Sequence, residues 1–260
     1  MAQEIVALND STGQLEVVKS TNQFLQPYDF QLAVSRGLVA GHTSIFRSAY
    51  SNSVTTTTST LWPKGTVYSF PSSASTMTLS SSSTSDTTQP VLIQGLDSTY
   101  ASISEVLTLN GQNPVTTVNS YLRINTLTVL TDSPQGNISL GTGTVTAGVP
   151  ANTYGYVAAL DNVSSAAVYT VPKGYTLYIL SGSISAGGST GSQTVTGKFY
   201  SKINGVLYLT SDINLANNFQ FFPYTPPVSL PEKTDTYNNV ISSSNTLSVS
   251  ATFNGILIAN

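Results

Sequence analysis

Ser, Thr, Val, Leu, Asn and Gly fill most of this 260-residue chain, while Asp, Glu, Lys and Arg make up only 8% of it. Residues 55–60 and 80–85 consist entirely of Ser and Thr. Thr and Val are β-branched and favour strands, and the scattered Gly, Pro, Asn and Ser supply turns. So few Lys, Glu and Arg residues leave little to solvate exposed helix faces. We therefore expect an all-β protein with a hydroxyl-rich, nearly neutral surface.

The composition also limits the classes of function. A hydrophobic share of 40% and a net charge of −3 are typical of a folded chain rather than a disordered one. The basic residues form no run, which argues against nucleic acid as a partner. No window approaches the roughly 18 consecutive apolar residues that a membrane-spanning helix needs. The absence of cysteine excludes disulfides and thiolate metal sites.

Residues 1–45 differ from the rest because charges are denser there and alternation is weak. We interpret this segment as an irregular N-terminal arm or anchor with one short helix over 27–35. The alternative is a ragged first strand of the domain that follows. The remaining length is enough for two β domains, and we expect antiparallel β-sandwich or jelly-roll-like domains at 46–150 and 151–260. The boundary is placed in the Gly- and Pro-containing stretch 148–152.

Short strand-like segments recur between turn signals in both halves. Asn204-Gly205, between two such segments, is the strongest signal for a two-residue hairpin, and Asn254-Gly255 is interpreted as a similar turn. The Pro-rich stretch 223–231 is expected to be a loop. The strand segments are 66–70, 76–80, 91–93, 106–109, 115–118, 121–124 and 127–130, a Gly-rich hairpin over 137–145, and then 168–171, 176–180, 195–203, 206–210, 219–222, 247–253 and 256–258.

No motif in the chain indicates catalysis, so we predict no catalytic, cofactor-binding or metal-binding residue. A formal G-x-S-x-G occurs around Ser189, but a strand-like segment follows where the hydrolase motif requires a helix. The one histidine, His42, is expected to have a structural hydrogen-bonding role. Acidic residues are scattered along the chain, so the sequence leaves open that two of them form a carboxylate pair of the glycosidase type. The preferred interpretation is that they are solvated acids in turns or members of isolated surface ion pairs. These acids are Asp86, Asp97, Glu105, Asp132, Asp161, Asp212, Glu232 and Asp235.

The sole tryptophan, Trp62, has two possible roles. Sugar-binding modules often present aromatic platforms, which makes Trp62 a candidate for glycan contact. It also directly precedes the first clear strand segment, where a tryptophan commonly closes the end of a sandwich. Core packing is the preferred interpretation, and the platform stays open as the alternative.

A series of short strings, in order along 36–258, resembles small virion structural proteins of tailed bacteriophages, as in marine and cyanobacterial phages. The family's usual Gly-Thr-Gly-Ala run after the Asp86-Thr87 pair is missing, and Thr88-Gln89-Pro90 stands in its place. The strings are RGLVAGH at 36–42, LWP at 61–63, YSFPSSA at 68–74, GLD at 95–97, EVLTLNG at 105–111, PVTT at 114–117, YLRIN at 121–125, YTVPKGYT at 169–176, EKTD at 232–235 and FNGIL at 253–257.

The resemblance implies a non-enzymatic part of a phage particle and supplies no catalytic residue. We expect a capsid decoration or head-fibre-like protein, assembled in the host bacterial cytoplasm and located in the virion. Its partners would be the major capsid protein or other virion proteins, and repeated copies are expected, with a trimer among the open arrangements. The alternative is a receptor- or glycan-binding module on the neck or tail that contacts a host surface glycan.

Overall fold

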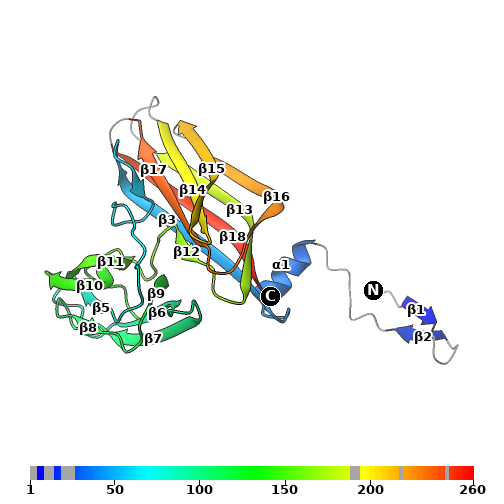
Figure 1. Ribbon diagram of the computed structural model, residues 1–260, viewed down its shortest axis with the longest axis horizontal. Coiled ribbons are helices and arrows are strands. Elements are labelled where there is room, and N and C mark those ends of the chain that lie inside the picture. Colours follow the sequence, from blue (N-terminus) through cyan, green and yellow to red (C-terminus); the bar gives the residue numbers. More distant parts are fainter. Residues whose placement is uncertain (1–4, 9–14, 19–26, 188–193, 217–218, 244–245) are drawn as a thin grey trace. The chain divides into compact units, whose positions relative to one another are not determined.

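The computed structural model describes residues 5–8, 15–18, 27–187, 194–216, 219–243 and 246–260. Nearly all regular structure in these residues is β-strand (Figure 1), which confirms the all-β fold class expected from composition. The chain divides into two compact units, residues 1–44 and 45–260. Within the described residues, no helix has the length and apolar character needed to cross a membrane.

The first unit contains a small hairpin and one helix. Strand β1 (Ile5–Leu8) pairs antiparallel with β2 (Leu15–Val18), a hairpin that the weak alternation of this segment did not predict. Helix α1 spans Pro27–Ser35, which confirms the helix expected there. The helix buries Val34, and the ring of Phe30 meets the ring of His42 edge-on at 5.8 Å.

The described residues of the second unit form four sheets, and every strand register described between their strands is antiparallel. The first sheet has the order β16 (Phe219–Leu230), β13 (Tyr175–Gly187), β18 (Leu247–Ala259) and β3 (His42–Val54). The second has the order β12 (Val168–Thr170), β17 (Asp235–Ser242), β14 (Thr194–Ile203) and β15 (Val206–Ala216), with β4 (Ser59–Thr60) also beside β17.

The other two sheets come from the middle of the chain. The third has the order β11 (Val149–Val157), β10 (Ile138–Thr146), β5 (Thr78–Ser81) and β8 (Val115–Thr116). The fourth has the order β7 (Ser102–Thr108), β6 (Pro90–Leu96) and β9 (Arg123–Val129).

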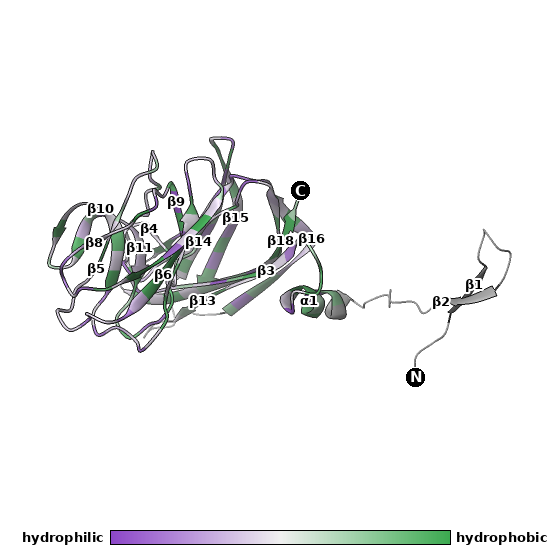
Figure 2. Ribbon diagram, turned by 90° about the horizontal axis from the view of Figure 1, so that it is seen from below, coloured by the Kyte–Doolittle hydropathy of each residue, from purple (hydrophilic) through white to green (hydrophobic). Residues whose placement is uncertain are grey.

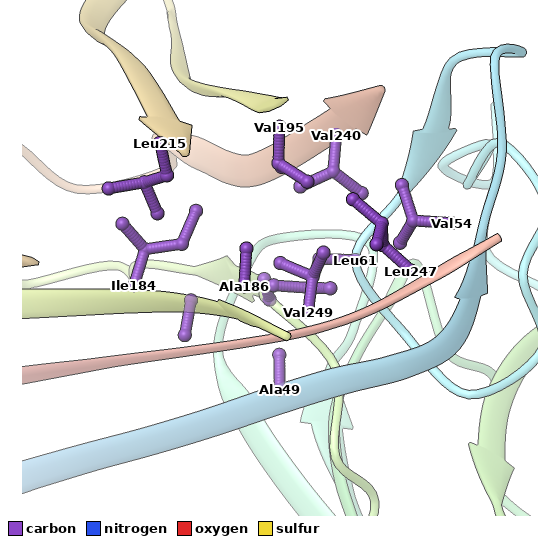
Figure 3. Packing of buried hydrophobic residues seen from close by; sticks show 12 residues of the cluster. Ala49, Val54, Leu61, Ile184, Ala186, Val195, Leu215, Val240, Leu247 and Val249 are labelled. Carbon is purple, nitrogen blue, oxygen red and sulfur yellow. The ribbon is translucent and has the colours of Figure 1, made fainter. Parts of the chain in front are cut away.

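The first two sheets face each other as the layers of a sandwich. Hydrophobic and hydrophilic residues follow one another along their strands (Figure 2), so that one face of each sheet is apolar. Ile184 on β13 and Val249 on β18 point toward Val195, Leu215 and Val240 on the opposite sheet (Figure 3). These side chains are almost completely buried, and each contributes about 1.5–3 kcal/mol by leaving water.

The third and fourth sheets enclose a second core. Leu79 and Leu140 from the third sheet pack in one cluster with Ile93 and Leu127 from the fourth, and all four are fully buried. The polar Asp86 is also fully buried, but its carboxylate accepts hydrogen bonds from the backbone N–H groups of Gln135 and Gly136. Burial of this charge is therefore compensated by hydrogen bonds.

Aromatic residues form a further cluster that Val168 of β12 joins. Trp62 is only 2% exposed, and its Nε1–H donates to the carbonyl oxygen of Thr66 at 2.7 Å. Its ring meets those of Tyr68 and Tyr156 edge-on. Trp62 is therefore a core residue, and the glycan-platform alternative for it is excluded.

Several expected boundaries differ from the structure. Residues 66–70 form no strand, because Tyr68 packs into the aromatic cluster instead. The hairpin expected within 137–145 is wrong, because these residues lie almost entirely in the single strand β10, which pairs with β11 across a turn at Ala147 and Gly148. The boundary expected at 148–152 therefore falls on this turn and the first residues of β11.

Strand pairing also joins residues across the expected divisions at 1–45, 46–150 and 151–260. Strand β4 pairs with β17, and β3 lies beside β18, although both precede the middle sheets in sequence. Strand β8, expected to return beside the segment at 106–109, pairs with β5 instead. Pairing between distant segments decides these positions, and local alternation does not reveal it.

Two turn signals are strand residues in the structure. The Pro-rich stretch 223–231 is not a loop, because β16 runs through Pro223 to Leu230 as an edge strand. Edge strands tolerate proline because one row of their backbone groups has no ladder partner. Strand β18 likewise continues through Asn254 and Gly255 without a turn.

Candidate interaction surface

The order of the sheets leaves two neighbouring strands of the sequence at sheet edges. Among the described strands, β15 is bonded to β14 alone at the end of its sheet, and β16 to β13 alone at the end of the opposite sheet. The Asn204-Gly205 turn joins β14 to β15, as the sequence predicts, and both turn residues have positive φ angles of 51° and 82°. Along residues 206–209 a second row of backbone groups therefore has no strand partner within the described part of the sheet.

The first residues of β15 are apolar and exposed. Val206, Leu207, Tyr208 and Leu209 are 54%, 50%, 51% and 50% exposed. Successive side chains of a strand point to opposite faces, so a run of four half-exposed residues means that neither face is covered here. We call Val206–Leu209 and the free backbone edge of this segment the β15 edge.

The β15 edge lacks the charges and prolines that commonly block pairing, and the bulge of β15, at Thr210, lies just beyond Leu209. Natural edge strands are commonly blocked by charged residues, proline or bulges. Val206–Leu209 contains no charge and no proline, and the acidic residue of β15, Asp212, lies further along and faces Lys198 at 3.6 Å. Four consecutive exposed apolar residues at an open edge are therefore suited to pairing with another chain.

The neighbouring edge strand, β16, is also apolar on its outer face. Phe219 and Phe221 are 61% and 55% exposed. They stand opposite Ser185 and Ser183 of β13, whose hydroxyl groups bond those of Ser250 and Thr252 on β18, each at 2.7 Å. The outer face of this sheet thus combines exposed rings with a ladder of uncharged hydroxyl pairs, as the composition predicts.

Several of the acids considered for catalysis have structural partners of their own. Asp235 is paired with Arg123, and Glu105 accepts hydrogen bonds from the backbone N–H groups of Val118 and Asn119 at 2.9 and 3.1 Å. Tyr50 donates to Asp161 at 2.7 Å. Within the described ranges no group of three or more His, Asp or Glu side chains is arranged to hold a metal ion. Two of the acids, Asp86 and Asp235, are buried rather than solvated.

The remaining candidate residues have structural surroundings or lie outside the described residues. The Nδ1 atom of His42 lies 2.9 Å from the carbonyl oxygen of Ala40, which fits its expected hydrogen-bonding role. Ser189 of the G-x-S-x-G motif lies outside the described residues.

The β15 edge was not recognised from the sequence as a site. The segment 206–210 was predicted as a strand, and β15 confirms it. Its first four residues form a short apolar run, which is normally interpreted as a buried strand. The signal that distinguishes them is the adjacent Asn204-Gly205 turn, since a hairpin end often extends beyond the core that covers the rest of the strands.

Comparisons with known proteins add little to this picture. No protein-family model and no curated protein match the sequence. Among solved structures, an infectious bursal disease virus VP2 subviral particle matches with a TM-score of 0.25 and 11% identity, covering 85% of this chain and 73% of that one. The Gx strain of the same virus gives a TM-score of 0.25 and 14% identity, covering 84% and 73%. These TM-scores are too low to support an argument about this chain.

Proposed function

We propose that the chain is a non-enzymatic structural protein of a tailed-phage virion, specifically a capsid decoration or head-associated protein. The ordered strings along 36–258 support the class of protein, and the β15 edge supports assembly as the activity. The observation that carries the proposal is the run of four half-exposed apolar residues, free of charge and proline, on an edge strand. Its partners would be further copies of the chain, the major capsid protein or other virion proteins.

Assembly at the β15 edge would combine two contributions. Backbone N–H and C=O groups would extend the sheet into the neighbouring chain, which is a recurrent mode of recognition. Each of the half-exposed side chains from Val206 to Leu209 would add about 1 kcal/mol, which is roughly half of the value for complete burial. Two copies meeting edge to edge make a two-fold dimer, whereas a contact between different surfaces closes a ring such as a trimer.

The mass of the full-length chain in solution tests this contact. We expect light scattering after size-exclusion chromatography to show an oligomer for the native chain and a monomer for Leu207→Asp/Leu209→Asp. Val106→Ser is the matched control, because Val106 is 52% exposed on β7, the edge strand of another sheet. A native chain that stays monomeric at all concentrations, or a double variant that keeps the native mass, would contradict assembly through β15.

The location in the particle is tested by imaging the virion. Copies numbering in the hundreds over the head would support decoration, while six, twelve or a few copies would indicate the neck or tail, because those parts have low rotational symmetry. We also propose that the N-terminal arm docks on the particle. Full occupancy by a chain lacking residues 1–40 would exclude this role for the arm.

A further inference from the structure

A cavity of about 320 Å³ opens in the second unit beside the buried pair Arg123 and Asp235. Its volume lies within the range of small-molecule sites, about 300–1,000 Å³. The lining comes from segments far apart in sequence: Tyr100, Arg123, Lys202, Asn204, Gly205, Lys233 and Asp235. We call this cavity the junction pocket.

Positive charge is concentrated in the junction pocket. The whole chain has only nine Lys and Arg residues, and three of them line this one cavity. Asp235 neutralises Arg123, and Glu232 lies 3.4 Å from Lys233. Lys202 is exposed and forms no ion pair within the part of the chain that the structure describes. One cation therefore remains in excess, in a protein whose net charge is −3.

The backbone around the pocket adopts costly conformations. Five described residues other than glycine have positive φ angles, and three of them line this cavity. They are Tyr100 at 66°, Asn204 at 51° and Lys233 at 65°. Such conformations are uncommon for tyrosine and lysine and cost on the order of 1–3 kcal/mol each. Backbone strain of this kind gathers at ligand sites, where it fixes the direction of side chains.

Neighbouring bonds hold these strained residues in place. The backbone N–H of Tyr100 donates to the carbonyl oxygen of Asp97, and that of Lys233 donates to the carbonyl oxygen of Val171 at 2.8 Å. The hydroxyl oxygen of Tyr100 lies 3.4 Å from Nη2 of Arg123, and the Arg123 guanidinium lies 5.5 Å from the centre of the Tyr100 ring. Tyr100, the aromatic residue of the pocket, is therefore held in contact with Arg123, which also lines it.

We propose that the junction pocket binds a single sugar unit that carries a carboxylate or sulfate group. Lys202 supplies the excess charge for the anionic group, with Lys233 beside it, Tyr100 supplies an aromatic surface, and Asn204 supplies polar groups for hydroxyls. The volume admits one small ring, which favours a sugar over the broad surface of a protein partner. This role differs from assembly at the β15 edge, although the two sites adjoin, since Gly205 precedes Val206 and Lys202 is paired with Leu207.

Calorimetric titration of the full-length chain at low ionic strength tests the proposal. The probes are glucuronic acid and glucose 6-sulfate, with neutral glucose, inorganic sulfate and a short Asp/Glu peptide for comparison. We expect both acidic sugars to bind at least about tenfold more tightly than glucose or sulfate, with affinity that falls as salt is added. Lys202→Met should weaken binding of the acidic sugars by about tenfold, and Lys202→Met/Lys233→Met should weaken it further.

Lys198→Met is the matched control, because Lys198 lies on the same strand β14 but outside the junction pocket. It should bind the acidic sugars as the native chain does. Failure of both acidic sugars to bind, or equal binding by native chain and Lys202→Met, would overturn the proposal. Sulfate binding as tightly as the sugars, or the acidic peptide binding more tightly at the same lysines, would overturn the assignment to a sugar. Lys202 is exposed and has no ion-pair partner among the described residues, so Lys202→Met is expected to fold, and a loss of binding can be assigned to the missing charge.

Discussion

Arg123 on β9 and Asp235 on β17 form a buried, bidentate ion pair. The Nε and Nη2 groups of Arg123 donate to the two carboxylate oxygens of Asp235 at 2.8 and 2.9 Å, and the side chains are only 9% and 6% exposed. Thr170 also donates to Asp235, and Arg123 reaches the carbonyl oxygens of Pro71 and Leu122. The pair thereby connects the fourth sheet, through β9, to the sheet that contains β17.

Removing one member of this pair should destabilise the protein strongly. Arg123→Met would leave the Asp235 carboxylate buried without its counter-charge, at a cost of about 3–5 kcal/mol. Burial acts to lower the pKa of Arg123, but its bonds to Asp235 outweigh this effect and raise the pKa, so the guanidinium stays charged at neutral pH. Denaturant unfolding of Arg123→Met, Asp235→Leu and the double variant measures the coupling. We expect the double variant to cost less than the two single changes together.

An exposed ion pair in the same unit provides the control. Lys198 and Asp212 lie 3.6 Å apart with side chains 41% and 43% exposed, and Lys198→Met should cost no more than about 1 kcal/mol. Strict additivity of the Arg123 and Asp235 variants would show that the two side chains act independently, against the geometry described above.

The fold class could be predicted from composition, whereas the path of individual strands could not. Asn204-Gly205 and Asn254-Gly255 are the same dipeptide flanked by the same kind of segment, yet the first is a turn and the second lies inside β18. At Gly255 a Cβ atom would lie 2.8 Å from the carbonyl oxygen of Tyr178 on the paired strand. Glycine is needed at this position because the backbone of β13 lies close to it, not because the chain turns there. Only the strand pairing reveals this.

The two proposed sites depend on tertiary structure even more strongly. Tyr100, Lys202 and Lys233 come from three distant parts of the sequence, and no local motif connects them. Trp62 was the residue that the sequence offered for glycan contact, and the aromatic cluster buries it. Exposure, which decides between a platform and a core residue, is a property of the packed chain.

Two glycines with similar φ angles should respond differently to alanine. Gly174 has a φ of +80° and no neighbour within 4 Å of an added Cβ, while Gly148 has a φ of +74° and would place its Cβ 1.8 Å from the carbonyl oxygen of Ser81. Gly174→Ala should cost only the conformational term, about 1–2 kcal/mol. Gly148→Ala adds a backbone clash, and we expect a cost above about 4 kcal/mol. Thermal unfolding of both variants makes the comparison, and equal losses would refute the close approach at Gly148.

Alkaline pH should destabilise the protein through its buried tyrosines. Burial and the hydrogen bond to Asp161 raise the pKa of Tyr50 to about 12, and burial raises the pKa values of Tyr68 and Tyr121 above their ordinary range. In the unfolded chain tyrosine ionises near pH 10. Above pH 10 the unfolded state therefore loses protons that the folded state keeps, and stability falls as pH rises toward 12.

Denaturant unfolding from pH 8 to pH 12 measures this dependence. The free energy of unfolding should show little tyrosine-linked change below about pH 9.5 and decline above it. Tyr50→Phe should make the decline shallower, because one titrating group is removed. Val118→Ala is the control, because Val118 is 85% exposed and carries no titrating group, so this variant should show the decline of the native chain. A decline that Tyr50→Phe leaves unaltered would rule out Tyr50 as a contributor.

Substitution of Trp62 should affect stability and not glycan contact. The ring is 2% exposed, packs against Tyr68 and Tyr156, and donates from Nε1 to Thr66. Trp62→Ala should cost about 3–5 kcal/mol because it leaves a large cavity. Trp62→Phe keeps most of the packing, so it should fold and should bind acidic sugars with the native affinity, since its position is not part of the junction pocket. Loss of sugar binding by a folded Trp62→Phe protein, with Lys202→Met unaffected, would return the glycan site to the aromatic cluster.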